Sequence, residues 1–116
     1  MGDFGLKVNI DDIGGEIVKN NERYIVIDNT SLKGLVVSKT ILHPKKETSG
    51  HLHKGQEEVY QFVHGHGRMT ITPGKTFFVS SGDVVLIEDG VFHKVYNDSG
   101  VEDLVFVCVF DGKRSH

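Results

Sequence analysis

The sequence predicts an all-β protein of the sandwich or barrel type. Short runs rich in β-branched and aromatic residues recur along its 116 residues, and turn residues separate them at fairly even spacing. No apolar pattern with the 3.6-residue period of a helix extends over a useful length. Many short strands joined by turns are the pattern of a β-sandwich or a β-barrel.

The expected strands follow one another between these turns. Residues 23–28 (RYIVID) form the first convincing strand, and residues 34–42 (GLVVSKTIL) form the second. Residues 51–53 are expected to be extended, before a turn at Lys54-Gly55. A single helical turn is expected near residues 9–14. The remaining strands are expected at residues 58–63, 68–72, 76–80, 84–87, 92–96 and 104–110, with Gly, Pro or Asn in the turn after each.

The last expected strand, residues 104–110, is apolar on both faces. Leu104, Phe106, Cys108 and Phe110 share one side, whereas Val105, Val107 and Val109 share the other. An antiparallel strand normally keeps one face in contact with water. Apolar residues on both faces therefore predict packing against a second sheet on one side and against another subunit, in a homodimer, on the other.

Length and composition limit the classes of function. A chain of this length is expected to form one domain, residues 1–116. The formal net charge of -3, without a basic run, argues against nucleic acid or an anionic membrane as the main partner. The N-terminus lacks the apolar region of a signal peptide and no stretch is long enough to span a bilayer, so a cytoplasmic protein is expected. The single cysteine, Cys108, excludes an internal disulfide.

Four of the seven histidines lie close together, beside an adjacent pair of glutamates. His51 and His53 point to the same side of an extended segment, because successive side chains alternate. Two imidazoles on an inward face need a polar partner, and a divalent metal is a natural one. After the turn, Glu57 or Glu58 brings a carboxylate back over the same pocket. An imidazole from a distant strand would complete a site of three nitrogens and one oxygen.

The spacing of these residues resembles the two sequence motifs of the cupins. The first motif is Gly, five residues, His-x-His, three or four residues, Glu, six residues and Gly. Residues 51–65 match it, but Lys45 stands where the leading glycine belongs. The second motif is Gly, five residues, Pro-x-Gly, two residues, His, three residues and Asn. Residues 82–97 match it, with the proline replaced by Glu88. The resemblance covers residues 44–97, with the first motif at about 44–65.

The resemblance implies a fold and a set of metal ligands. The fold would be a double-stranded β-helix, or jelly-roll barrel, formed by a single cupin domain over residues 1–116. The implied ligands of a divalent transition metal (Mn, Fe, Zn or Ni) are His51, His53, Glu58 and His93. Glu57 is the rival carboxylate, but only Glu58 also gives the six-residue gap to Gly65.

The candidates for catalysis are Glu58 and Tyr60. Tyr60 has the same parity as Glu58 along the strand and is expected to line the same interior, where it hydrogen-bonds a substrate or packs in the core. Gln56 is expected either to support a metal ligand or to lie exposed in the turn. His64 and His66 are expected to be exposed at a strand end.

Three functions follow for a small-molecule pocket of this kind. The favoured one is an isomerase or epimerase acting on a small sugar-like or carbonyl substrate, because SGHLHKGQEEVYQF resembles the metal motif of cupin-type sugar-phosphate isomerases. The alternatives are an iron-dependent dioxygenase and a non-catalytic module that binds a small molecule. Lys39, Lys54 and Arg68 are expected either to meet an anionic substrate group or to be surface charges.

Overall fold

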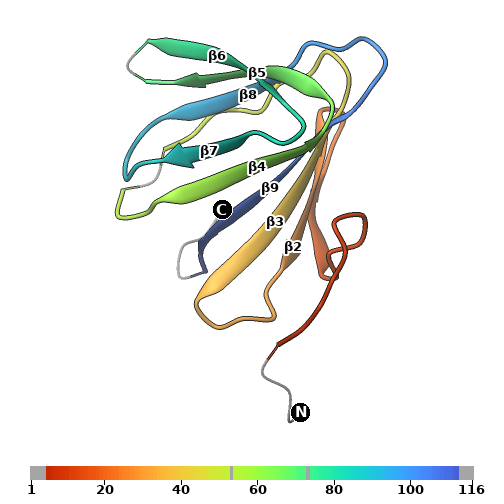
Figure 1. The fold of residues 1–116 in the computed structure, drawn as a ribbon, viewed down its shortest axis with the longest axis vertical. Helices are drawn as coiled ribbons and strands as arrows, with labels where there is room; N and C mark the ends of the chain where they lie inside the picture. The colour runs from red at the N-terminus through yellow and green to blue at the C-terminus, as the bar shows by residue number, and fades with distance from the viewer. Residues whose placement is uncertain (1–4, 53, 73, 113–116) are drawn as a thin grey trace.

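The computed structural model describes residues 5–52, 54–72 and 74–112, and these residues form two antiparallel sheets with no helix (Figure 1). The all-β prediction is confirmed. Within the described ranges no helix is long and apolar enough to cross a membrane. The strands are β1 (Glu16–Asn20), β2 (Tyr24–Asn29), β3 (Leu35–Leu42), β4 (Glu58–His64), β5 (His66–Ile71), β6 (Lys75–Ser80), β7 (Val84–Ile87), β8 (His93–Asn97) and β9 (Leu104–Asp111).

The larger sheet has the strand order β1-β2-β3-β9-β4-β7, and the smaller sheet has the order β6-β5-β8. The segment before β4 runs beside β8 and extends the smaller sheet, because Glu47 pairs with Tyr96 and His51 pairs with His93. In Figure 1 the smaller sheet lies at the top, and the larger sheet curves below it toward the N-terminus. The largest fully buried side chains between the sheets are Phe62, Leu42, Met69, Leu104 and Val95.

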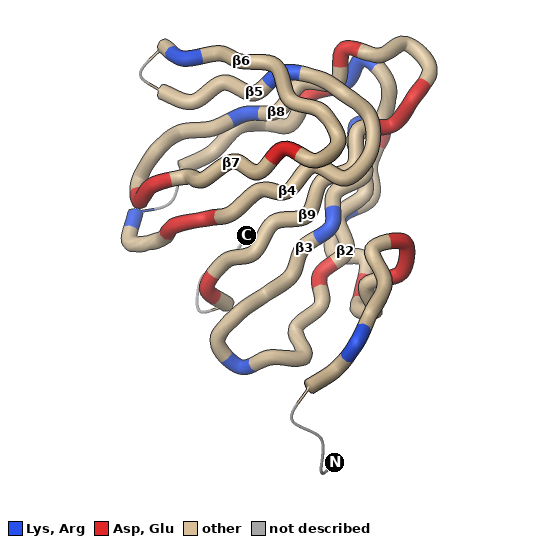
Figure 2. Tube along the Cα trace, in the orientation of Figure 1, with Lys and Arg blue, Asp and Glu red and all other residues tan. Residues whose placement is uncertain are grey.

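Alternation along the central strands decides which side chains face the interior. In β4, Glu58, Tyr60 and Phe62 are buried, whereas Val59 between them is exposed. β9 lies between β3 and β4 and is apolar on both sides, as expected. Figure 2 shows that charged residues gather in the turns and at strand ends, while the middle of β9 carries none.

Two parts of the structure differ from the sequence prediction. β1 was not expected, because the apolar pair Ile17-Val18 is too short to predict a strand on its own and the register shifts between Ile17 and Lys19. The helical turn expected near residues 9–14 was wrong. Asn9 and Asp12 instead close a tight turn through backbone hydrogen bonds, and the Asn9 side chain accepts the Asp11 N–H at 2.8 Å. An asparagine side chain that bonds the backbone two residues later favours a turn over a helix.

Candidate metal centre

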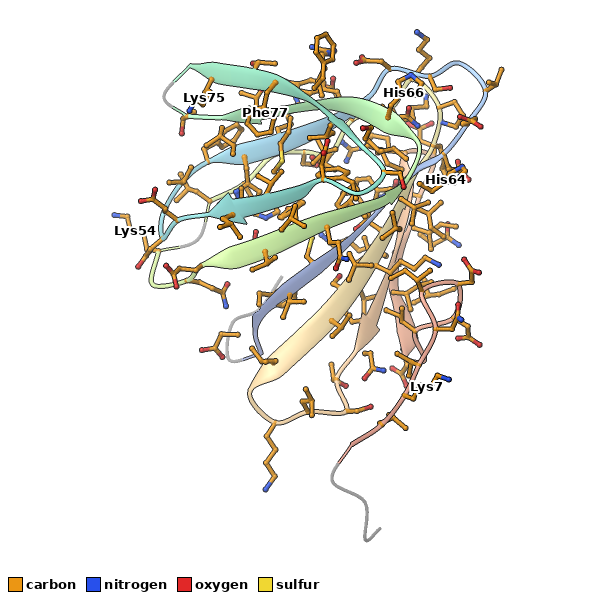
Figure 3. The ribbon with its side chains drawn as sticks, in the orientation of Figure 1. Lys7, Lys54, His64, His66, Lys75 and Phe77 are labelled. Carbon is orange, nitrogen blue, oxygen red and sulfur yellow. The ribbon has the colours of Figure 1, made fainter. Side chains whose placement is uncertain are left out.

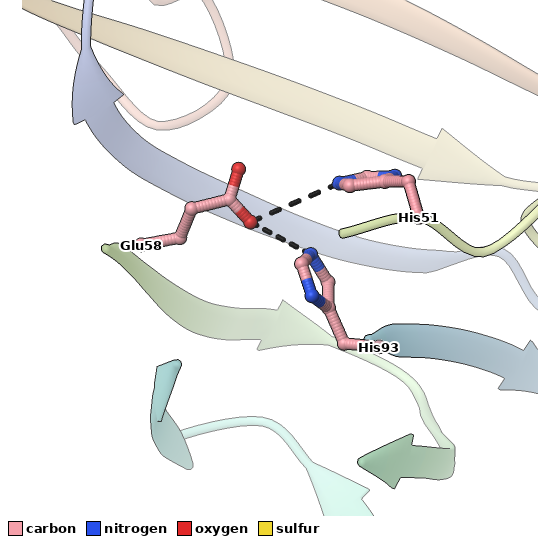
Figure 4. A group of neighbouring side chains, drawn as sticks. All are labelled: His51, Glu58 and His93. Atoms are coloured by element: carbon pink, nitrogen blue, oxygen red, sulfur yellow. Dashed lines mark ion pairs between the residues drawn. The ribbon is translucent and has the colours of Figure 1, made fainter. Parts of the chain in front are cut away.

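His51, Glu58 and His93 converge at one end of the interior (Figure 4). Glu58 Oε2 lies 2.7 Å from His93 Nε2 and 3.8 Å from His51 Nε2. One ligand atom from each residue lies within 4.8 Å of the other two. Glu58 and His93 are buried, whereas the His51 side chain is 44% exposed. The three residues thus form a small cluster that is open on the His51 side.

The imidazole of His93 is oriented by its own backbone neighbourhood. Nδ1 lies 2.9 Å from the Val91 carbonyl oxygen, which can only accept, so Nδ1 carries the proton that it donates. In the neutral ring Nε2 then keeps a lone pair. In this tautomer Nε2 has no proton to donate to Glu58 Oε2, so the 2.7 Å contact between these two atoms is not a hydrogen bond. A lone pair buried beside a carboxylate needs a cation to compensate it, and two imidazoles with one carboxylate form a donor set that suits a divalent transition metal.

His51 is carried by residues 46–51, which are fastened to β8. Thr48 N donates to the Val95 carbonyl oxygen at 2.9 Å. Lys94 donates through Nζ to Glu47 Oε1 at 2.9 Å, and this hydrogen bond raises the pKa of the Lys94 amine. A main-chain and a side-chain hydrogen bond thus hold residues 46–51 against β8. They place His51 directly opposite His93.

Gly50 allows the close approach of this segment to the residue before His93. Its φ of 78° is in the left-handed region, and a Cβ at this position would lie 2.6 Å from Cζ of Phe92. The Phe92 ring therefore packs on the Gly50 backbone. Both residues immediately precede a member of the cluster, so this contact helps to set the separation of the two imidazoles.

The structure separates the two rival carboxylates. Glu58 is 5% exposed and faces the imidazoles, whereas Glu57 is exposed. Tyr60, two residues along β4, is buried and its ring lies edge-on to the His93 ring with centroids 5.4 Å apart. His53, the fourth expected ligand, lies outside the described residues.

The other singled-out residues lie away from the cluster or serve the fold. His64 and His66 are exposed at the far ends of β4 and β5, opposite the Lys54 turn in Figure 3, as expected. Gln56 is buried rather than exposed, and its amide nitrogen donates to the Asp111 carbonyl oxygen at 2.8 Å. Arg68 is paired with Asp98, and its hydrogen bonds lower the pKa of that carboxyl.

A pocket of about 230 Å³ opens beside the cluster. It is bounded by the inner face of the larger sheet and by residues 48–51. Lys19 of β1 contributes to its wall and was not among the site residues predicted from the sequence. The lining residues are Lys19, Tyr24, Val26, Ser38, Thr40, Thr48, Ser49, Gly50, His51, Glu58, Tyr60, Phe106, Cys108 and Phe110.

Comparison with known families identifies the fold. A family model described as a cupin domain matches residues 38–110, more than half of the chain. The chain is a cupin. The match spans all three clustered residues, and the resemblance seen in the two motifs is therefore confirmed. No curated protein matches this cupin in sequence.

Solved structures give the same fold at low sequence identity. A conserved protein with a double-stranded β-helix domain from Klebsiella pneumoniae is 20% identical, with a TM-score of 0.79 over 97% of this cupin and 94% of that chain. A predicted oxalate decarboxylase from Thermotoga maritima is 23% identical, with a TM-score of 0.74 over 91% and 98%. KdgF from a Halomonas species is 13% identical, with a TM-score of 0.74 over 92% and 94%. The expected double-stranded β-helix is thereby confirmed.

Proposed function

We propose that this cupin is a metal-dependent enzyme that isomerises or epimerises a small sugar-like or carbonyl substrate. The observation that carries the proposal is the cluster of His51, Glu58 and His93 at the edge of a pocket that Tyr60 also lines. Two imidazoles and a carboxylate hold a divalent metal while leaving positions open for substrate oxygens. His53 is proposed as the fourth ligand on the basis of the motif alone.

Both proposed reactions begin with loss of the proton from the carbon next to the carbonyl. In the isomerisation a proton is added to the former carbonyl carbon and a hydroxyl proton passes to the carbonyl oxygen. In the epimerisation a proton is added to the same carbon from its opposite face, and the carbonyl stays in place. A metal held by His51, Glu58 and His93 would polarise the carbonyl and its neighbouring hydroxyl. Glu58 is the candidate for carrying the carbon-bound proton, because its carboxyl group lies in the pocket wall beside both imidazoles (Figure 4). Tyr60 both donates and accepts hydrogen bonds, so it is the candidate for moving the oxygen-bound proton.

Metal content tests the proposed site directly. Protein purified without chelator should contain one equivalent of transition metal per chain by mass spectrometry of the elements. The variant His51→Ala should lose most of it and still fold, because that side chain is 44% exposed. The exposed His66 supplies the matched control, and His66→Ala should retain the metal. Equal metal content in both variants would contradict the assigned ligands.

Proton exchange tests the proposed reaction. The metal-loaded enzyme is incubated with aldoses, ketoses and their phosphates in deuterated water, and nuclear magnetic resonance follows deuterium entering the carbon next to the carbonyl. Replacing the hydroxyl in Tyr60→Phe should slow exchange by about 10²-fold or more. A metal-loaded protein that gives no exchange with any of these compounds refutes the proposed reaction. Iron-dependent oxygen uptake would then favour the dioxygenase.

We also propose that two copies associate through the outer face of the larger sheet. The segment before β1 crosses this face at β2, where Asn29 donates to the Ile13 carbonyl oxygen. The side chains that β3, β9, β4 and β7 turn outward are mostly apolar. Val107 and Lys39 are already buried within the single chain, whereas Leu35, Val59, Val84 and Leu86 are exposed, and exposed apolar patches commonly mark interaction sites. The apolar side chains of this face are Leu35, Val37, Ile41, Val59, Val84, Leu86, Val105, Val107 and Val109.

Four polar side chains share this face, with Lys39 and Gln61 near its middle and His64 and Asp111 at its ends. Lys39 of β3 and Gln61 of β4 lie on either side of Val107 in one cross-strand row. Lys39 is 8% exposed in the single chain, and a two-fold axis along β9 would set it opposite Gln61 of a second copy and keep the two lysines apart. The partner is therefore a second copy of this chain, in the symmetric arrangement usual for homodimers.

A further inference from the structure

We infer that Lys19 binds an anionic group of the substrate, so that the pocket selects a small hydroxylated carboxylate or phosphate ester. This inference rests on the proposed function of the same pocket. Lys39 cannot take this role, because the alternation of β3 turns it to the outer face. Arg68 is already paired with Asp98. Lys19 differs from both residues because it follows a register shift in its strand.

A β-bulge turns Lys19 toward the pocket. Residues two apart in a regular strand share a face, and Ile17 pairs with Ile27 in the outer-facing row of Lys39. The register shifts before Lys19, which therefore pairs with the pocket residue Val26. The extra residue reverses the face on which Lys19 lies. Bulges commonly redirect a side chain in this way beside binding sites.

The positively and the negatively charged residue of the pocket wall lie at opposite ends of the pocket. Among the described lining residues, Lys19 is the only lysine or arginine and Glu58 is the only carboxylate. They stand on β1 and β4, with β2, β3 and β9 between them. No ion pair of Lys19 occurs within the described ranges. A cation beside a partly enclosed cavity attracts an anion, and the metal cluster at the other end receives the uncharged, reacting part.

Two hydroxyl groups lie between these ends. Ser38 and Thr40 of β3 are 3% and 7% exposed, and both line the pocket. Neither side chain takes part in a hydrogen bond to another described residue. Buried polar groups normally have partners, so these hydroxyls are available to a ligand. They suit a molecule with hydroxyl groups between its anionic end and its reacting end.

The size of the pocket limits the ligand. Its volume of about 230 Å³ is below the range of roughly 300–1,000 Å³ that is usual for ligand pockets. A single sugar acid or a short sugar phosphate is therefore the expected class. A disaccharide or a nucleotide would extend beyond the pocket.

Binding measured by calorimetry on the metal-loaded protein tests the inference. The probes are gluconate as the carboxylate, ribose 5-phosphate as the phosphate ester, and ribitol as the neutral hydroxylated control. In Lys19→Gln, affinity for the anion that the pocket accepts should fall about tenfold, as expected for one lost charge-assisted hydrogen bond. Affinity for ribitol should be unchanged. The anion that responds distinguishes a carboxylate site from a phosphate site.

Lys75→Gln is the matched control, because Lys75 is also an exposed lysine but lies on the smaller sheet (Figure 3). It should leave all three affinities unchanged. Wild-type protein that binds neither anion more tightly than ribitol overturns the inference, and so does an equal anion preference in Lys19→Gln. Deuterium exchange with neutral aldoses does not involve Lys19. Failure of that assay therefore counts against the proposed reaction and not against the assignment of Lys19.

Discussion

Lys45 adopts a backbone conformation that its side chain makes unfavourable. Its φ of 62° makes it the only residue other than glycine with a positive φ in the described ranges. The conformation is held by a hydrogen bond from Lys45 N to the Ser99 carbonyl oxygen. Lys45 is also the position where the cupin motif has its leading glycine. The position at which the sequence departs from the cupin motif is thus also the position at which the backbone is strained.

Replacing this lysine by glycine should stabilise the protein. Relief of the left-handed conformation is worth about 1–2 kcal/mol, and the flexibility of glycine in the unfolded chain offsets about 0.5–1 kcal/mol of it. Lys45→Gly should therefore raise the free energy of unfolding by up to about 1.5 kcal/mol, measured by urea denaturation. Its neighbour Lys46 does not have a positive φ, and Lys46→Gly should lower the same quantity. Destabilisation by both substitutions would show that Lys45 is not strained.

At the scale of residues, the sequence predicted the members of the cluster better than the rest of the pocket. Glu58 was distinguished from Glu57 by the spacing to Gly65, and its burial agrees. The neighbourhood of Lys19 was not predictable in this way. A single extra residue in β1 decides which side Lys19 faces, and no composition or periodicity marks that residue as extra.

At the scale of elements, the decisive piece is the segment of residues 46–51. It is too irregular to count as a strand, yet two isolated bridges and a lysine–glutamate pair hold it against β8. Turn residues predicted the regular strands because each glycine or proline ends a run of β-forming residues. Pairing of this segment with β8 joins residues more than forty positions apart, and local sequence carries no sign of it.

The contact between Gly50 and Phe92 makes the metal affinity depend on this segment. In Gly50→Ala the new methyl group would meet the Phe92 ring and push the imidazoles apart. Metal affinity, measured by competition with a chelator, should fall about 10–100-fold, as for other residues that orient ligands. Gly55 has a similar φ of 83° but open space around it. Gly55→Ala thus reproduces the backbone strain without the collision, and it should keep the metal affinity. Equal losses in both variants would point to backbone strain alone.

At the scale of the whole molecule, the apolar outer face predicts association. Sedimentation should give the mass of two chains. Val59→Lys places a charge in the middle of the face at a position 39% exposed in the single chain, so it should yield folded monomers. Val101→Lys, at an exposed loop position off the face, is the control and should remain dimeric. Monomeric wild-type protein would refute the proposed dimer.

Substitutions of Gln61 test the position of the proposed two-fold axis. Gln61→Lys would oppose two lysines across the interface, whereas Gln61→Glu would oppose a lysine and a carboxylate. Like charges brought together across an interface cost several kcal/mol. The dimer dissociation constant should therefore rise in the first variant and fall in the second. Equal effects of the two substitutions would place the axis elsewhere.

β9 gives the pocket and the outer face a common wall. Phe106, Cys108 and Phe110 line the pocket from one side of this strand, and the valines between them lie on the other side. Only the thickness of one backbone separates a ligand from a second subunit docked on that face. A ligand that fills one pocket and shifts β9 would also shift the interface. Because of the two-fold axis, this shift would reach β9 of the other subunit. Cooperative binding between the two pockets would then need no hinge, lid or separate regulatory site.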